Sequence, residues 1–170
     1  MSGVRVAVVM GVSGSGKTTL AKALSGAWEA TFLDADDFHS DEARALMARG
    51  QPLGDDMRQP WVARIAAELQ QRMAGGARVT LAFSGLRRRH RDMLRGAGLP
   101  LRFLFLRGER ALIGERMRGR EGHYMPLSLL GSQFATLEEP DGEPDVIVLP
   151  VDLPPAVQLQ RALHALAAPI

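Results

Sequence analysis

A glycine-rich octapeptide near the N-terminus has the most specific chemistry in the chain. It consists of Gly11, Val12, Ser13, Gly14, Ser15, Gly16, Lys17 and Thr18. Glycines let successive backbone N–H groups turn inward around an anion, and a helix beginning near Lys17 adds the positive end of its dipole. The lysine can reach the β- and γ-phosphates, and the Thr18 hydroxyl can bind Mg²⁺. The octapeptide, extended by Thr19, therefore predicts a nucleoside triphosphate site with Mg²⁺ and disfavours a plain glycine-rich turn.

Carboxylates follow the next apolar run, residues 31–34. Asp34 ends this run, whereas the run at 79–83 ends without an acid, so Asp34 is the best candidate to orient Mg²⁺. If the extended chain continues, Asp36 points to the same side and can accept a proton from an attacking hydroxyl. The alternative is that these acids cap the helix that begins near Ser40.

A proline-broken segment, residues 50–61, can form the wall of an acceptor site. Asp55 can bond polyol hydroxyls and Arg58 can form a forked contact with a carboxylate. Pro60 and Trp61 are expected to begin the following helix, with Trp61 as a core anchor. The alternative is a loop with a purely structural role.

An arginine-rich run, residues 87–95, follows the third strand. Its composition suggests a nucleic-acid surface, but it has no interleaved aromatic residues, which favours a solvated helix face. Ser84 and Arg87 lie nearest the strand end, so we expect them to touch the acceptor. No nucleic-acid partner is predicted.

A second basic stretch ends the helix expected at 109–119. Its glycines and cations are typical of a kinase lid, at approximately residues 116–127, that closes over ATP and excludes water. Arg120 is predicted to contact the transferred phosphoryl group, and Arg116 to bind the nucleotide. The alternative is that both arginines only stabilise the negative end of the helix dipole. His123 can meet the substrate.

Apolar runs and helical patterns alternate along the chain. Strands are predicted at 4–10, 31–34, 79–83, 101–106 and 146–150, and helices at 17–27, 40–49, 60–74, 87–96, 109–119, 127–138 and 155–167. This alternation predicts a single α/β domain, residues 1–170, with a five-stranded parallel sheet flanked by helices in three layers. Functional residues are then expected in loops after the carboxyl ends of the strands.

Composition narrows the function further. The chain has no cysteine, which excludes disulfides and thiolate catalysis, and its four histidines are too scattered to suggest a metal cluster. Lysine occurs only at Lys17 and Lys22, so the N-K-x-D loop of guanine-reading switches is absent. No long apolar run suggests a membrane span or signal peptide, and we expect a cytoplasmic protein.

Several blocks together resemble the bacterial gluconokinase family. The blocks are the phosphate loop and residues 33–39, 50–61, 84–95, 120–124 and 133–140. The resemblance implies phosphorylation of D-gluconate by ATP to 6-phospho-D-gluconate and ADP, on a P-loop kinase fold related to shikimate and nucleoside monophosphate kinases. It also implies a homodimer, and it places His39 and His123 in the acceptor site.

The chain departs from this family at Gly54 and Met57, where Asn and Asp are usual. Because Asp55 and Arg58 remain, gluconate is the lead acceptor. Two alternatives stay open: a kinase for another small anion, such as shikimate or a nucleoside monophosphate, and a non-catalytic nucleotide-binding regulatory protein.

Overall fold

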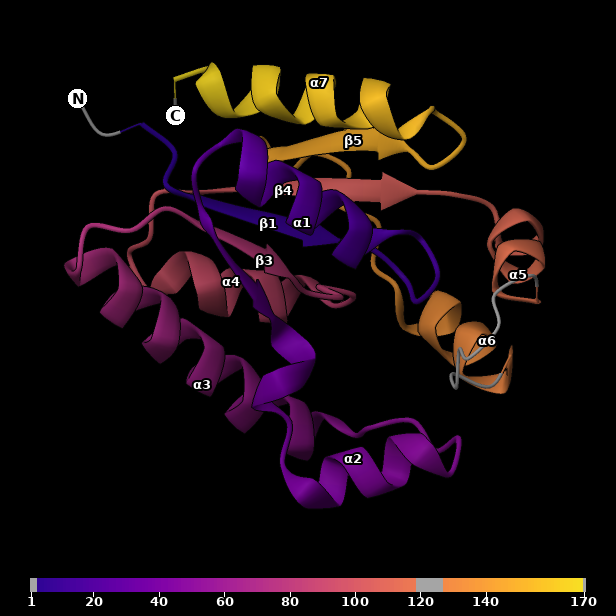
Figure 1. Ribbon diagram of the computed structural model, residues 1–170. Coiled ribbons are helices and arrows are strands. Elements are labelled where there is room, and N and C mark those ends of the chain that lie inside the picture. Colours follow the sequence, from indigo (N-terminus) through magenta and orange to yellow (C-terminus); the bar gives the residue numbers. More distant parts are fainter. Residues whose placement is uncertain (1–2, 119–126, 170) are drawn as a thin grey trace.

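A twisted parallel sheet forms the centre of the molecule. The computed structural model describes residues 3–118 and 127–169. The strands are β1 (Val6–Met10), β2 (Thr31–Asp34), β3 (Val79–Ala82), β4 (Leu101–Arg107) and β5 (Val146–Pro150). They pair in the order β2-β3-β1-β4-β5, and every neighbouring pair is parallel (Figure 1). The carboxyl ends of all five strands therefore lie along one edge.

Helices cover both faces of this sheet. The described helical elements are α1 (Lys17–Ala27), the 3₁₀ turn η1 (Ala35–Phe38), α2 (Asp41–Ala48), α3 (Asp55–Ala74), α4 (Arg88–Gly96), α5 (Arg110–Arg118), α6 (Leu127–Thr136) and α7 (Pro155–Ala167). Helices α1 and α7 pack together on one face, and α3 and α4 on the other (Figure 1). Within the described part of the chain, no helix is long and apolar enough to cross a membrane.

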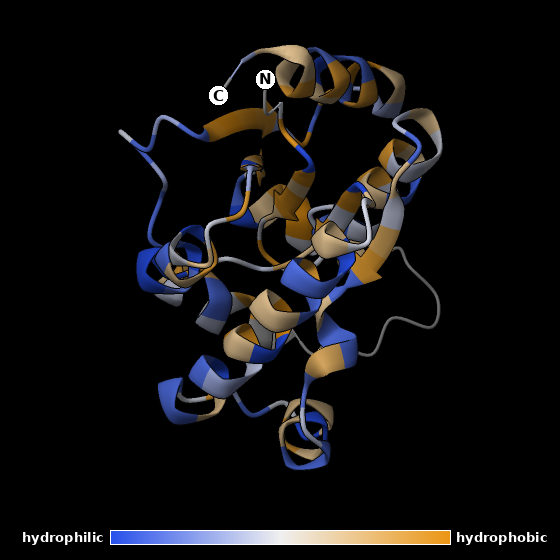
Figure 2. Ribbon diagram, turned by 90° about the vertical axis from the view of Figure 1, so that its left-hand side faces the viewer, coloured by the Kyte–Doolittle hydropathy of each residue, from blue (hydrophilic) through white to orange (hydrophobic). Residues whose placement is uncertain are grey.

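The core follows from alternation along the central strand. Ala7 and Val9 belong to the cluster beneath α1 and α7, whereas Val6, Val8 and Met10 belong to the cluster beneath α3 and α4. Because successive side chains of a strand point to opposite faces, β1 is apolar throughout and contributes to both clusters. Figure 2 shows hydrophobic residues concentrated on the central strands and hydrophilic residues on the surrounding helices.

The predicted α/β fold is confirmed, with local differences. Helix α3 begins at Asp55, after an N-cap at Gly54, and includes Pro60, which was predicted to start it. Two acids in the first turn stabilise the positive end of the helix dipole and favour this earlier start. The chain also does not stay extended after Asp34, because the Asp34 Oδ1 accepts the Asp36 N–H at 3.0 Å and caps η1.

The arginine-rich run was expected to form a solvated helix face, but helix α4 is solvated only in part. Arg88 is exposed and lies 3.8 Å from Asp92, as the i, i+4 spacing predicts. Arg91, however, is fully buried and forms a two-pronged contact with Glu143, with N–O distances of 2.9 and 2.6 Å. The arginine-rich run therefore contributes a buried ion pair to the packing of the domain.

Candidate active site

The phosphate loop joins β1 to α1 and has the backbone geometry of an anion site. Gly16 is the N-cap of α1 with φ +97°, and Gly14 has φ +80°. A Cβ on Gly14 would lie 2.6 Å from the Met117 side chain. Only glycine fits this position, because both its φ and its close neighbour exclude a side chain. The N-terminus of α1 thus faces the pocket with its N–H groups available to an anion.

Lys17 lies at the first position of α1 and points into the pocket. Its Nζ donates to the carbonyl oxygens of Gly11 and Val12, each at 3.0 Å. Burial lowers the pKa of Lys17 to about 8, and the nearby carboxylates of Asp36 and Asp34 oppose this shift. A bound phosphate would supply the anionic partner that favours the charged form.

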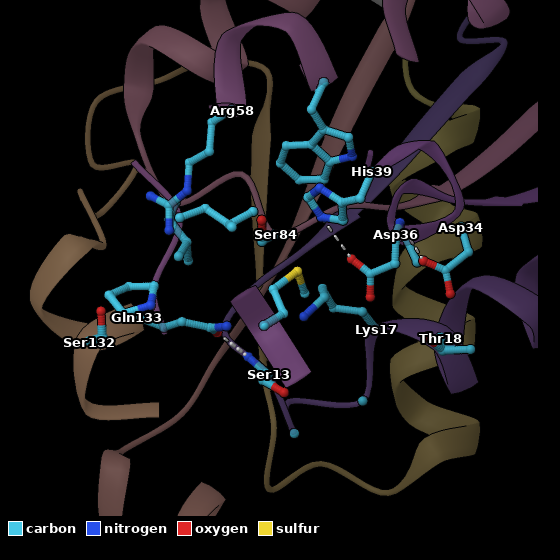
Figure 3. Close-up of a pocket in the computed structure, with 18 of the residues that line it drawn as sticks. Ser13, Lys17, Thr18, Asp34, Asp36, His39, Arg58, Ser84, Ser132 and Gln133 are labelled. Atoms are coloured by element: carbon cyan, nitrogen blue, oxygen red, sulfur yellow. Dashed lines mark hydrogen bonds and ion pairs between the residues drawn. The ribbon is translucent and has the colours of Figure 1, made fainter. Parts of the chain in front are cut away.

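The phosphate loop also contacts helix α6. The backbone N–H of Ser13 donates to the Oε1 of Gln133 at 2.6 Å, across 120 residues of sequence (Figure 3). Ser132 and Gln133 both line the pocket. This contact fixes α6 against the loop, so residues near the C-terminal third of the chain complete the site.

Asp34 and Asp36 occupy the same pocket as Lys17. Burial is the main cause that raises the pKa of Asp34, although the backbone hydrogen bond from Asp36 opposes it. For Asp36, the hydrogen bond with His39 is the main cause of a lowered pKa, assisted by the charge of Lys17. Asp36 therefore remains ionised at neutral pH and is able to accept a proton.

Thr18 and Asp34 provide donors that fit Mg²⁺. Both line the pocket, and both offer the hard oxygen ligands that this ion prefers. Within residues 3–118 and 127–169, no group of three or more His, Cys, Asp or Glu side chains could hold a metal without further ligands. One or two protein oxygens plus phosphate oxygens and water is the usual environment of nucleotide-bound Mg²⁺.

The pocket extends beyond Asp36 to Arg58. The whole cavity measures about 370 Å³, within the range of small-molecule sites. Figure 3 shows Lys17 and Asp36 on one side of it and Arg58 on the other. Arg58 is half-buried, and burial together with the charge of Arg87 lowers the pKa of its guanidinium. An anionic group bound here would pair with the guanidinium, and it would therefore favour the charged form of Arg58 against burial and the charge of Arg87.

Most of the predicted site residues line this one cavity. These are Ser13, Gly14, Gly16, Lys17, Thr18, Thr19, Asp34, Asp36, His39, Arg58 and Ser84. Three further members of the phosphate loop, Gly11, Val12 and Ser15, are buried beneath it.

Other predicted residues lie elsewhere. Asp55 contacts His90, at 3.0 Å, and Arg89, and it does not line the cavity. Arg87 also lies outside the lining, although its charge acts on Arg58. Arg116 donates to the carbonyl oxygen of Val151 at 2.8 Å, so it reaches the loop after β5.

Arg120 and His123 lie outside the described residues, as does most of the expected lid at 116–127. Their predicted roles remain predictions.

The segment that was predicted to form the wall of a site, residues 50–61, contributes Gln51, Leu53 and Arg58 to the lining. The sequence patterns gave no signal for Met47 or Ser132, which also line the cavity. Trp61 also lines it, although the sequence suggested only a core anchor. Its Nε1 donates to the buried carbonyl oxygen of Ala35 at 2.7 Å, so it supports the turn that presents Asp36.

Comparisons with known proteins identify a domain family and close relatives of this chain. A family model described as "AAA domain" matches residues 6–140. A gluconokinase of Arabidopsis thaliana is 38% identical in an alignment 176 positions long, which covers 96% of this chain and 93% of the relative.

Two solved structures are similar over nearly their full length. A sugar kinase from Janibacter sp. HTCC2649 is 45% identical with a TM-score of 0.91, covering 96% of this chain and 94% of that one. A gluconokinase from Sinorhizobium meliloti 1021 is 41% identical with a TM-score of 0.86, covering 95% and 91%.

The expected relation to shikimate kinases holds for the fold. The shikimate kinase of Aquifex aeolicus is 15% identical, with a TM-score of 0.63 and 95% of each chain covered. The shared architecture does not indicate a shared acceptor.

Proposed function

Since the chain belongs to the AAA-domain family and to the gluconokinases, we propose that it transfers the γ-phosphoryl group of ATP to D-gluconate. The products are 6-phospho-D-gluconate and ADP. The terminal hydroxyl of gluconate is the nucleophile in this reaction.

One observation supports this reaction above others: a single cavity contains both a phosphate-binding loop and a cationic group on the opposite side. Lys17 and Thr18 lie at the phosphate end, Asp36 lies between, and Arg58 lies on the acceptor side. Gluconate has a carboxylate at one end and a primary hydroxyl at the other. With its carboxylate on Arg58, its hydroxyl extends toward Asp36 and the γ-phosphate.

Each residue of the pocket has a separate role in the proposed transfer. Lys17 exchanges its two carbonyl partners for the phosphate oxygens, and Asp36 orients the hydroxyl and accepts its proton. Thr18 and Asp34 would hold Mg²⁺, which neutralises charge on the phosphate oxygens when bound. Phosphoryl transfer needs little covalent participation by protein groups, so positioning and electrostatics account for most of the catalysis.

A panel of acceptors tests the proposal. ADP release by the purified protein is measured with MgATP alone and with D-gluconate, shikimate or a nucleoside monophosphate added. We expect stimulation by gluconate above the others. Stimulation by another acceptor would reassign the substrate, and no stimulation by any acceptor would favour a non-catalytic nucleotide-binding protein.

The proposal also includes expectations that come from the sequence and from the family resemblance. The protein is a cytoplasmic homodimer that needs Mg²⁺, serves gluconate utilisation, and closes a lid containing Arg120 over ATP. Light scattering tests the dimer, and chelation by EDTA, which should abolish turnover until Mg²⁺ is restored, tests the metal.

A further inference from the structure

The proposed base, Asp36, lies on a short turn and has an exposed side chain. It lies on the four-residue turn η1, and its side chain is 70% exposed. An exposed carboxylate samples several rotamers, whereas transfer requires its oxygen at a fixed place beside the hydroxyl. Its Oδ1 lies 3.5 Å from the Nε2 of His39. This contact is therefore in a position to restrict the carboxylate.

His39 is held by its surroundings. Its side chain is 4% exposed, and its ring stacks on Trp61 with centroids 4.2 Å apart and planes 17° from parallel. Its Nδ1 is buried and has no hydrogen-bond partner within the described part of the chain. A neutral imidazole has one N–H, and a buried N–H without an acceptor is costly. The contacts therefore favour the tautomer with hydrogen on Nε2, which faces Asp36 (Figure 3).

Trp61 connects this imidazole to the backbone of the turn. Its Nε1 donates to the carbonyl oxygen of Ala35, the first residue of η1, and its ring meets Phe83 at a centroid distance of 5.3 Å. A single side chain of α3 thus fixes both the turn that bears Asp36 and the ring that contacts its carboxylate.

We propose that His39 and Trp61 are positioning residues that hold the Asp36 carboxylate toward the acceptor hydroxyl. His39 then acts through Asp36, and not by binding the acceptor as the family resemblance had suggested. This inference rests on the proposed function, because it needs Asp36 to serve a phosphoryl transfer.

Two amide replacements of His39 separate positioning from other roles. The amide nitrogen of His39→Gln reaches the place of Nε2, whereas that of His39→Asn reaches only the place of Nδ1. We expect His39→Asn to lower kcat by about tenfold to a hundredfold, since small misplacements of reacting groups have effects of this size. KM for the acceptor and the affinity for ATP should stay within about twofold, and His39→Gln should recover most of kcat.

The exchange of Trp61 for Phe provides a second test. Trp61→Phe keeps a ring for stacking but loses the N–H to Ala35, so we expect a partial loss of kcat. The matched control is Trp28→Phe, because Trp28 packs beneath the opposite face of the sheet. The control should leave kcat unchanged.

Three outcomes would overturn the inference. The first is a raised acceptor KM with unchanged kcat in both His39 variants, which would make His39 a substrate ligand. The second is an equal loss of kcat in both variants with an equal fall in Tm, which would make its role only structural. The third is an unchanged kcat in His39→Asn. ADP release by the wild-type protein with gluconate tests the proposed function separately. The kcat values of the two His39 variants are compared with whichever acceptor the wild-type protein phosphorylates.

Discussion

At the scale of single residues, neighbouring groups in one pocket differ because their environments differ. Asp34 and Asp36 are two positions apart, yet burial raises the pKa of the first and the hydrogen bond with His39 lowers that of the second. The lowered pKa keeps Asp36 charged at neutral pH, although it also makes this carboxylate a weaker base, and the half-buried carboxylate of Asp34 gains from an adjacent cation. The proposed roles, contact with the hydroxyl for Asp36 and metal ligand for Asp34, are compatible with this difference.

The exchange of Asp36 for Asn tests the base. Asp36→Asn keeps the shape of the side chain but removes its charge, so we expect kcat to fall by about 10²- to 10⁴-fold while ATP binding is nearly unchanged. Calorimetric titration with ATP and steady-state kinetics with gluconate measure the two quantities. The control is Asp37→Asn, an exposed neighbour on the same turn, and an equal effect in both variants would contradict the assignment.

The exchange of Arg58 for Ala tests the carboxylate contact. We expect KM for gluconate to rise about tenfold or more, because charge-assisted hydrogen bonds contribute about 1.5–3 kcal/mol. Turnover at saturating gluconate should change little. Arg49→Ala, at an exposed position just after α2, should leave KM unaltered. An unchanged KM in Arg58→Ala would argue against this contact.

At the scale of secondary-structure elements, buried polar contacts fix how the helices sit on the sheet. Arg91 of α4 contacts Glu143 and also donates to the carbonyl oxygens of Gly85 and Glu138. Its guanidinium is fully buried, and Glu143 is nearly so. Burial tends to raise the pKa of Glu143, but hydrogen bonds from Arg91 and Arg95 outweigh it and lower this pKa to about 2. The pair therefore stays charged at neutral pH.

Breaking this pair should destabilise the domain. Arg91→Leu leaves Glu143 buried without one of its two arginines, and we expect the free energy of unfolding to fall by about 3–5 kcal/mol. Arg88→Leu, on the exposed side of the same helix, should change it by less than about 1 kcal/mol. Urea denaturation measures both variants, and equal effects would show that the buried network adds nothing specific.

At the scale of the whole molecule, the free energy of unfolding should depend on pH through His90. This residue of α4 is buried against the α3 start, where it contacts Asp55 and faces Arg58, Arg87, Arg89 and Glu138. Burial, assisted by the three arginines, lowers the pKa of His90 to about 4. Between about pH 6.5 and 4 the unfolded chain thus binds a proton at this position that the folded chain does not.

The resulting contribution to stability is complete above about pH 6.5 and is lost as the pH falls toward 4. His90→Gln keeps a donor for Asp55 and cannot titrate, so its unfolding free energy should show a weaker decline across this window. Denaturation at a series of pH values tests this, and parallel curves for the two proteins would contradict it.

Local sequence determined much of the molecule. The phosphate loop was predictable because its glycines, lysine and threonine act within eight consecutive residues, and strands β2 and β5 and helices α1 and α7 matched the predicted ranges. Short apolar runs and caps are local signals, so they are readable without knowledge of the rest of the chain.

Tertiary structure alone decided which distant residues meet. Nothing near Asp55 in sequence indicates that it faces His90, nor does the region around Gln133 indicate a contact with Ser13, 120 residues away. The stack of Trp61 on His39 likewise depends on where α3 packs against the sheet edge. Side-chain contacts across large sequence separations depend on packing of the whole core, so the sequence identified the phosphate loop and suggested His39, Arg58 and Ser84, while only the fold decided that these residues share one cavity with the loop.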